Sequence, residues 1–186
     1  MAAVGPGQMD DPTPCSAFTV RDLMTHMVTV LRRVAGVGRG LPPMLPQFAV
    51  EGVPDSGLVA QWSAGAHDIE AVWRDDGVLE RTLTLPFGQF PGAQALAVYT
   101  GEVTLHTWDL ARATGQEPSW DDQVVALGEA AMRQVLPGEG RLAEFERQVA
   151  QLPPEHRPSA PFGEVSPLGP DAPGIDRLVA FSGRRP

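Results

Sequence analysis

The chain has 186 residues, enough for one domain with a sizeable core, and its apolar fraction of 42% is ordinary for a globular protein. A formal net charge of −9 and a pI near 4.8 argue against nucleic acid or an anionic membrane as a partner, because both select basic surfaces. The lone cysteine, Cys15, rules out an intrachain disulfide and predicts a reducing, cytoplasmic setting.

The first predicted helix follows a Gly- and Pro-rich start. Thr19 is a suitable N-cap, and the carboxylate of Asp22 in the first turn suits the helix dipole. Apolar residues at helical spacing continue to about Ala35, and the glycines at 36, 38 and 40 are expected to end the helix. His26 lies at the margin of this apolar stripe, so by itself it is more simply a half-exposed helix histidine than a ligand.

A second helix and one short strand are predicted next. After a Pro-rich loop over residues 39–54, apolar residues recur at helical spacing between Asp55 and Trp73. Residues 78–86 then alternate between apolar and polar side chains, which is typical of a short strand or an extended crossing segment. No partner strand is evident, so this segment does not predict a sheet.

Residues 92–116 predict the central helix of the fold. An α-helix turns by about 100° per residue, so residues four and seven apart share a face. Glu102, His106 and Asp109 therefore lie inside the apolar face of this helix. Burial of ionisable groups is costly unless they are paired or coordinate a metal. Because Glu102 and His106 are one turn apart and can reach one ion, they suggest half of a metal site.

Three further helices complete the predicted elements. They are expected over about 121–136, 141–151 and 173–181. The inward face of the first is expected to comprise Val124, Leu127, Ala130, Ala131 and Val135. Long helices without βαβ alternation predict a single all-α domain over residues 1–186, with a Pro-rich tail from about residue 152.

Three stretches of the sequence resemble a known family. They are TPCSAFTVRDLMTHMV (13–28), LPFGQFPGAQALAVYTGEVTLHTWDLARATGQ (85–116) and DAPGIDRLVAFSGRRP (171–186). Together they resemble the actinobacterial metal-binding proteins of the mycothiol-dependent maleylpyruvate isomerase type, within the wider DinB/YfiT-like superfamily. The family more often has Trp where Phe18 stands. The resemblance implies an all-α, DinB-like, up-and-down bundle of four helices.

The same resemblance implies a metal site and a chemistry. In such proteins a divalent metal, often zinc or nickel, is held by an early histidine and by an acidic residue and a histidine on a later helix. Matching the motifs assigns these ligands to His26, Glu102 and His106. Three protein ligands with one open position are the pattern of catalytic zinc. Relatives use the metal to activate a low-molecular-weight thiol, mycothiol in actinobacteria, so the implied partners are that thiol and an electrophile for transfer or isomerisation.

Simpler interpretations of these residues stay open. Glu102 and His106 also fit a hydrogen-bonded pair on a helix. The whole chain also fits a non-catalytic module that binds a metal or a small molecule. Cys15 is more typical of a small buried hydrophobe than of a nucleophile, and Pro14 and Phe18 beside it suggest packing.

Charged residues near the predicted site have two interpretations each. Asp109 is expected either to accept a hydrogen bond from His26 across the bundle or to pair with Arg112 on its own helix. Arg184 and Arg185 are expected to form a solvated tail. As an alternative suggested by the resemblance, either Arg177 or Arg184 fits a contact with a carboxylate of a substrate.

In one respect the chain departs from the family. A full helix usually precedes the TPC motif, whereas 12 residues precede Thr13 here. We therefore expect a bundle without its first helix. Such a bundle would expose an apolar groove, and this favours association into a homodimer.

Overall fold

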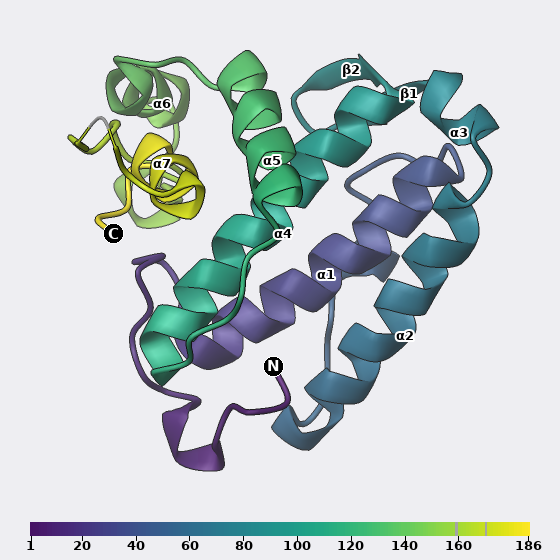
Figure 1. The fold of residues 1–186 in the computed structure, drawn as a ribbon, viewed down its shortest axis with the longest axis horizontal. Helices are drawn as coiled ribbons and strands as arrows, with labels where there is room; N and C mark the ends of the chain where they lie inside the picture. The colour runs from purple at the N-terminus through teal and green to yellow at the C-terminus, as the bar shows by residue number, and fades with distance from the viewer. Residues whose placement is uncertain (159, 170) are drawn as a thin grey trace.

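A computed structural model describes residues 1–158, 160–169 and 171–186, and it is the all-α, DinB-like bundle that the sequence predicts (Figure 1). The helices are α1 (Val20–Gly38), α2 (Asp55–Trp73), α3 (Gly77–Glu80), α4 (Gly92–Thr114), α5 (Asp122–Val135), α6 (Arg141–Val149) and α7 (Gly174–Phe181). A hairpin of β1 (Thr82–Leu85) and β2 (Gly88–Pro91) lies between α3 and α4. Within the described residues, no helix is long and apolar enough to cross a membrane.

The first two long helices run side by side in the same direction, so this pair departs from the up-and-down order that the family resemblance implies. At their starts, Arg21 of α1 pairs with Asp55 of α2. At their other ends, the Trp73 Nε1–H donates to the backbone carbonyl of Val34 over 3.2 Å. The long loop over residues 39–54 is therefore needed to carry the chain from the end of α1 back to the start of α2 (Figure 1).

Helix α1 continues three residues beyond the predicted end at Ala35. A Cβ atom at Gly36 would lie 2.3 Å from the ring of Phe48, and one at Gly38 would lie 2.7 Å from Val72. These glycines therefore allow close packing inside the helix, and they do not terminate it. The prediction is wrong for Gly36 and Gly38, because a glycine that serves packing and a glycine that ends a helix look alike in sequence. It is confirmed for Gly40, which follows the C-cap Arg39 with φ of 84° and donates its backbone N–H to the carbonyl of Val37.

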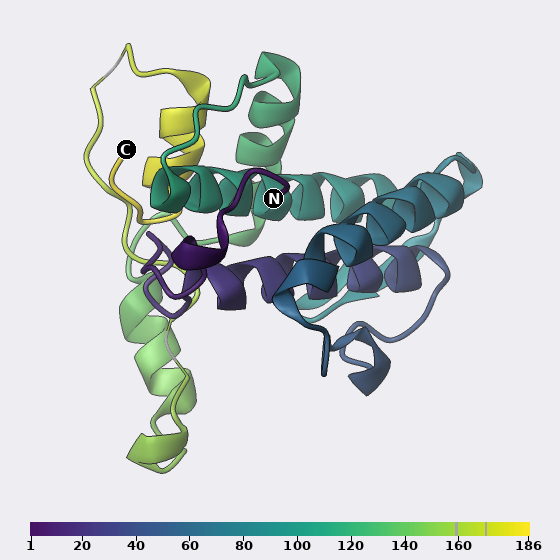
Figure 2. The same cartoon turned by 90° about the horizontal axis from the view of Figure 1, so that it is seen from below.

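Helix α4 is central and antiparallel to its neighbours. Near its start, Ala95 packs in one buried cluster with Val37 from the end of α1, and near its end Leu110 packs with Val20 from the start of α1. Figure 2 shows α4 with α1 on one side and α5 and α7 on the other. As predicted, α4 ends at Gly115, which takes the left-handed conformation with φ of 68°.

Helix α5 presents a different face to the core from the one predicted. Val124 and Leu127 are 43% and 52% exposed, and Ala130 is also exposed, whereas Ala131 is buried as expected. The reason is a close contact between two glycines, since a Cβ at Gly128 would lie 2.8 Å from the Cα of Gly101 in α4. Because α5 contacts α4 through a glycine, its buried face is shifted by about one residue from the predicted face. Apolar periodicity alone does not show such a shift. The buried residues of α5 are Val125, Gly128, Glu129, Ala131 and Met132.

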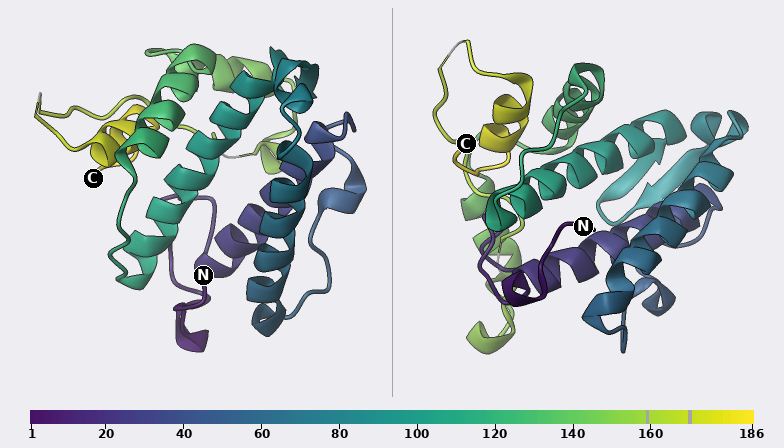
Figure 3. Two further views of the ribbon diagram at one scale, coloured as in Figure 1. Left: turned by 45° about the vertical axis from the view of Figure 1, so that its right-hand side comes forward. Right: turned by 60° about the horizontal axis from the view of Figure 1, so that its bottom comes forward.

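The strand predicted within residues 78–86 is observed only at Thr82–Leu85, because Gly77–Glu80 form the short helix α3. Contrary to expectation, this strand has a partner. β1 pairs antiparallel with β2, with Leu83 opposite Phe90. The hairpin packs against α1 and α4 (Figure 3). The sequence of β2, GQFP, has no alternation and contains a proline, so it carries none of the usual signals of a strand.

Candidate metal centre

The three predicted ligands come together between α1 and α4. His26 Nε2 lies 3.5 Å from a carboxylate oxygen of Glu102, and the rings of His26 and His106 meet edge to face with centroids 5.0 Å apart. One ligand atom from each of the three residues lies within 4.8 Å of the other two. The antiparallel packing of α1 and α4 thus brings a nitrogen–oxygen–nitrogen donor set to one place, close enough to hold a single ion.

Local features of the sequence fix the position of His26. Thr19 caps α1 as predicted: its hydroxyl accepts from the backbone N–H of Asp22, and the Asp22 carboxylate accepts from the backbone N–H of Thr19. This capping box sets the start of the helix two turns before His26. The ring of Phe18 stacks on the imidazole of His26 at a centroid distance of 5.1 Å. Phe18 therefore serves as an aromatic wall at the place where the family more often has Trp.

His106 is oriented by a buried acid. Its Nδ1 lies 3.0 Å from Oδ2 of Asp109, one turn along α4, and the Asp109 side chain is fully buried. A nitrogen that donates to a carboxylate is not available to a metal, so the Nε2 of His106 is the nitrogen left for one. Both predictions for Asp109 were wrong, since it pairs neither with His26 nor with Arg112.

Arg184 completes this arrangement from the C-terminal segment. Its Nε and Nη2 donate to the two carboxylate oxygens of Asp109 over 3.2 and 3.1 Å, and only 7% of the residue is exposed. The prediction of a solvated tail is therefore wrong for Arg184. The chain returns to the core through Gly183, which takes a φ of 90° and packs directly on Gly163. A contact between residues 75 positions apart has no signal in local sequence patterns.

The metal centre opens into a cavity of about 840 Å³. His26, Glu102 and His106 line one part of it. Helices α5 and α6 and the segment after residue 159 contribute the opposite wall, which includes Met132, Arg141, Phe145 and Phe162. The volume lies within the usual range for small-molecule sites, about 300–1,000 Å³.

Charges around the centre favour an ionised Glu102. Burial alone would raise the pKa of its carboxyl group. His26, whose Nε2 lies 3.5 Å from the carboxylate, and the neighbouring His106 and Arg33 outweigh this effect and lower the pKa. An ionised carboxylate is the form that binds a metal. On the same helix, burial and the nearby Glu102 charge raise the pKa of Tyr99, so its phenol remains a hydrogen-bond donor.

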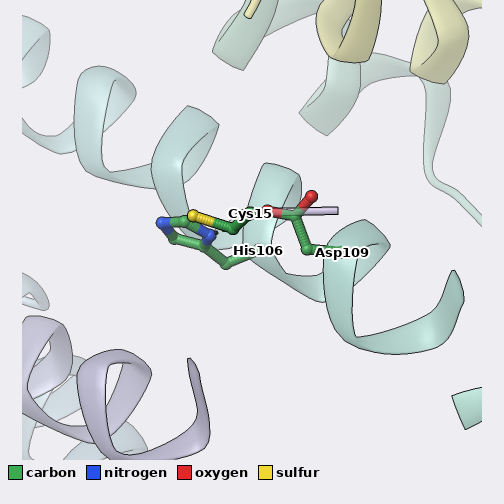
Figure 4. Close-up of side chains that lie close together, drawn as sticks. All are labelled: Cys15, His106 and Asp109. Carbon is green, nitrogen blue, oxygen red and sulfur yellow. Dashed lines mark hydrogen bonds and ion pairs between the residues drawn. The ribbon is translucent and has the colours of Figure 1, made fainter. Parts of the chain in front are cut away.

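Cys15 lies next to His106 and Asp109 (Figure 4). One ligand atom from each of the residues Cys15, His106 and Asp109 lies within 4.8 Å of the other two. Both carboxylate oxygens of Asp109 are already bound by the Arg184 guanidinium, whose positive charge opposes a second cation there. Burial raises the pKa of the Cys15 thiol, Arg184 opposes this shift and Asp109 adds to it. The half-buried thiol therefore ionises less readily than a free one, which does not favour a role as a nucleophile.

The two other histidines lie away from this centre. His67 is exposed on α2, where its Nδ1 lies 2.7 Å from the Ser63 carbonyl of its own helix. His156 is exposed in a single 3-10 turn over Pro154–His156.

Comparison with known proteins agrees with this picture. Residues 1–111 match the family described as the mycothiol maleylpyruvate isomerase N-terminal domain. The chain belongs to this family. The matched region contains His26, Glu102 and His106, whereas the cavity wall from α5 to Arg184 lies beyond it.

Full-length relatives are found in Mycobacterium tuberculosis. Two uncharacterized proteins, from two strains of that species, are each 33% identical to the chain over 99% of its length and 89% of their own. No solved structure matches the chain.

Proposed function

We propose that the protein binds a divalent metal ion, most readily zinc, through His26, Glu102 and His106. We further propose that it uses this ion with mycothiol in a transferase or isomerase reaction. The observation that carries the proposal is the convergence of two imidazoles and one carboxylate at the wall of the 840 Å³ cavity. Membership of the mycothiol maleylpyruvate isomerase N-terminal domain family supports the choice of thiol.

The donor set suits such an ion. Two imidazoles and one carboxylate are a common set for zinc in catalytic sites, and the same set accepts nickel and other divalent ions. The protein supplies three ligands, and the cavity adjoins them, so a fourth position is open to a small molecule. When bound, a divalent metal favours ionisation of a thiol that it coordinates, and the thiolate is the nucleophilic form.

The chain's own residues hold and shield this site. Asp109 accepts the Nδ1–H of His106 and so fixes the tautomer that leaves Nε2 toward His26 and Glu102. Arg184 compensates the buried charge of Asp109 and holds that carboxylate in place through two hydrogen bonds. Phe18 covers one face of His26 and limits access of water to the ligand.

Thiol dependence tests the proposal. Zinc-loaded protein is mixed with mycothiol and a series of electrophiles, and consumption of the thiol is compared with the same mixture without protein. We expect faster consumption with wild-type protein, loss of the effect in His106→Ala, and retention in His67→Ala, a matched change of an exposed histidine outside the centre. Bound metal without acceleration for any electrophile would contradict the enzymatic role and favour a non-catalytic binding module.

A further inference from the structure

Unpartnered polar atoms mark one region of the cavity. Among the described residues, three buried side-chain nitrogen or oxygen atoms have no hydrogen-bond partner: Nε of Arg33, the hydroxyl of Tyr99 and Nη2 of Arg141. All three residues line the same cavity. More than nine in ten buried polar groups in proteins are hydrogen-bonded, so three exceptions at one cavity point to a ligand that accepts hydrogen bonds.

Two of these residues flank the metal centre on the same side. Arg33 follows His26 by seven residues, or two helical turns, and so shares its face of α1. Tyr99 precedes Glu102 by three residues on α4. Because α1 and α4 are antiparallel, both steps lead from the metal ligands toward the same end of the bundle. Arg33 and Tyr99 line the same cavity as the three metal ligands.

Arg33 is unlike the other arginines of the cavity. Arg184 is already paired with Asp109 through two hydrogen bonds. Arg141 already donates through Nε and Nη1 to the backbone carbonyls of Pro137 and Phe181, so only its Nη2 lacks a partner. Arg33 forms no ion pair or side-chain hydrogen bond with any described residue. Its guanidinium is therefore the one in this cavity wall that remains free to bind an anion.

We propose that Arg33 and Tyr99 form a carboxylate-binding subsite beside the metal centre, and that this subsite selects electrophiles bearing a carboxylate group. A guanidinium fork matches a planar carboxylate with two parallel hydrogen bonds, and the Tyr99 hydroxyl adds a third donor from the opposite helix. The unpartnered donors are the observation that supports the carboxylate subsite, independently of any thiol chemistry. Its role in selecting an electrophile rests on the proposed thiol chemistry.

Fluorine NMR tests the subsite directly. Tyr99 is the single tyrosine of the chain, so growth with 3-fluorotyrosine gives one fluorine signal inside the cavity. Metal-free protein is titrated with succinate and, separately, with succinamide, its uncharged counterpart. We expect a saturable shift with succinate only, lost in Arg33→Gln and kept in Arg74→Gln, which removes an exposed arginine that pairs with Glu70 on α2. No saturable shift, an equal shift with succinamide, or an unchanged shift in Arg33→Gln would overturn the subsite.

A matched pair of electrophiles tests selection. Zinc-loaded protein carrying Cys15→Ala, which removes the chain's own thiol, is assayed with mycothiol and either iodoacetate or iodoacetamide. Each rate is divided by the rate without protein. We expect a higher normalised rate with iodoacetate than with iodoacetamide. The ratio of these two rates should fall on the order of tenfold in Tyr99→Phe and in Arg33→Gln, as for the loss of one hydrogen bond to a charged group.

The two experiments separate the two proposals. A succinate shift without any thiol transfer supports the subsite and contradicts the proposed enzyme. Thiol transfer without preference for iodoacetate and without a succinate shift supports the enzyme and overturns the subsite.

Discussion

Two groups of buried polar residues flank the candidate metal centre, and they differ in how completely they are hydrogen-bonded. On one side, His106, Asp109 and Arg184 form a closed network in which both carboxylate oxygens and the facing imidazole nitrogen have partners. On the other side, Arg33 and Tyr99 have a buried nitrogen and a buried hydroxyl without partners. We refer to these groups as the Asp109 network and the Arg33 pair.

The difference separates a supporting role from a binding role. A fully bonded network in a low-dielectric interior holds its members rigidly, and this suits the orientation of a metal ligand. Unpartnered donors lower the stability of the fold, so their presence at a cavity is best explained by a ligand that pairs with them. Removal of residues from the two groups should therefore have opposite effects on stability and on binding.

The largest expected effect is on the Asp109 network. Asp109→Ala leaves the buried Arg184 guanidinium without a counter-charge, and loss of one partner of a buried pair costs about 3–5 kcal/mol. Urea denaturation followed by circular dichroism measures the change. Asp10→Ala is the matched control, because this carboxylate is 88% exposed and its pair with Arg21 contributes at most about 1 kcal/mol. A loss below about 1 kcal/mol for Asp109→Ala would show that the network is not tightly held.

A double substitution sharpens the same point. Asp109→Leu combined with Arg184→Met removes both charges and keeps apolar volume, so we expect most of the lost stability to return. It also removes the acceptor of His106 Nδ1, and second-shell changes of this kind weaken metal binding by about 10–100-fold. Full stability with unchanged zinc affinity would contradict the orienting role of Asp109. Isothermal titration with zinc makes the comparison.

Zinc itself should stabilise the fold by an intermediate amount. At a free zinc concentration 100 times the dissociation constant, binding to the native state adds about 2.7 kcal/mol. We expect this gain in thermal denaturation of wild-type protein and of His67→Ala, and no gain in His26→Ala. An equal gain in His26→Ala would place the zinc at another site.

The smallest expected effect on stability is at the Arg33 pair. Tyr99→Phe removes a buried hydroxyl that has no partner, so the free energy of unfolding should change by no more than about 0.5 kcal/mol or should rise. The comparison is again made by urea denaturation. Destabilisation by more than about 1 kcal/mol would show that the Tyr99 hydroxyl is bonded in the native protein and would remove the contrast between the two groups.

Much of the fold could be predicted because it depends on local patterns. Thr19 and Gly115 mark helix ends through chemistry that acts within one turn, and apolar periodicity located the long helices. The face of α5 could not be predicted, because it depends on contact between Gly101 and Gly128 of different helices. The partner of β1 was missed because Gly88–Pro91 has the composition of a turn.

The candidate site divides in the same way. Spacing on α4 placed Glu102 and His106 together, and only the family motif added His26. The i,i+3 spacing of His106 and Asp109 held the signal for their pairing, but Asp109 was expected to support His26 across the bundle instead. Arg184 could not have been found from local patterns, because its position depends on the return of the chain through Gly183.

The Arg33 pair was also beyond sequence reasoning. Arginine and tyrosine on amphipathic helices are ordinary residues, and nothing in their spacing shows that they lack hydrogen-bond partners. Their lack of partners becomes visible only when the side chains around the cavity are placed.

Metal content of untagged protein is the most direct test of the central claim. Elemental mass spectrometry is applied to wild type, His106→Ala and His67→Ala, each purified and reconstituted with zinc in the same way. The account predicts close to one divalent ion per chain in wild type and His67→Ala, and loss of that ion in His106→Ala. No ion in the reconstituted wild type, or an ion retained in His106→Ala, would contradict the assignment of the metal centre to His26, Glu102 and His106.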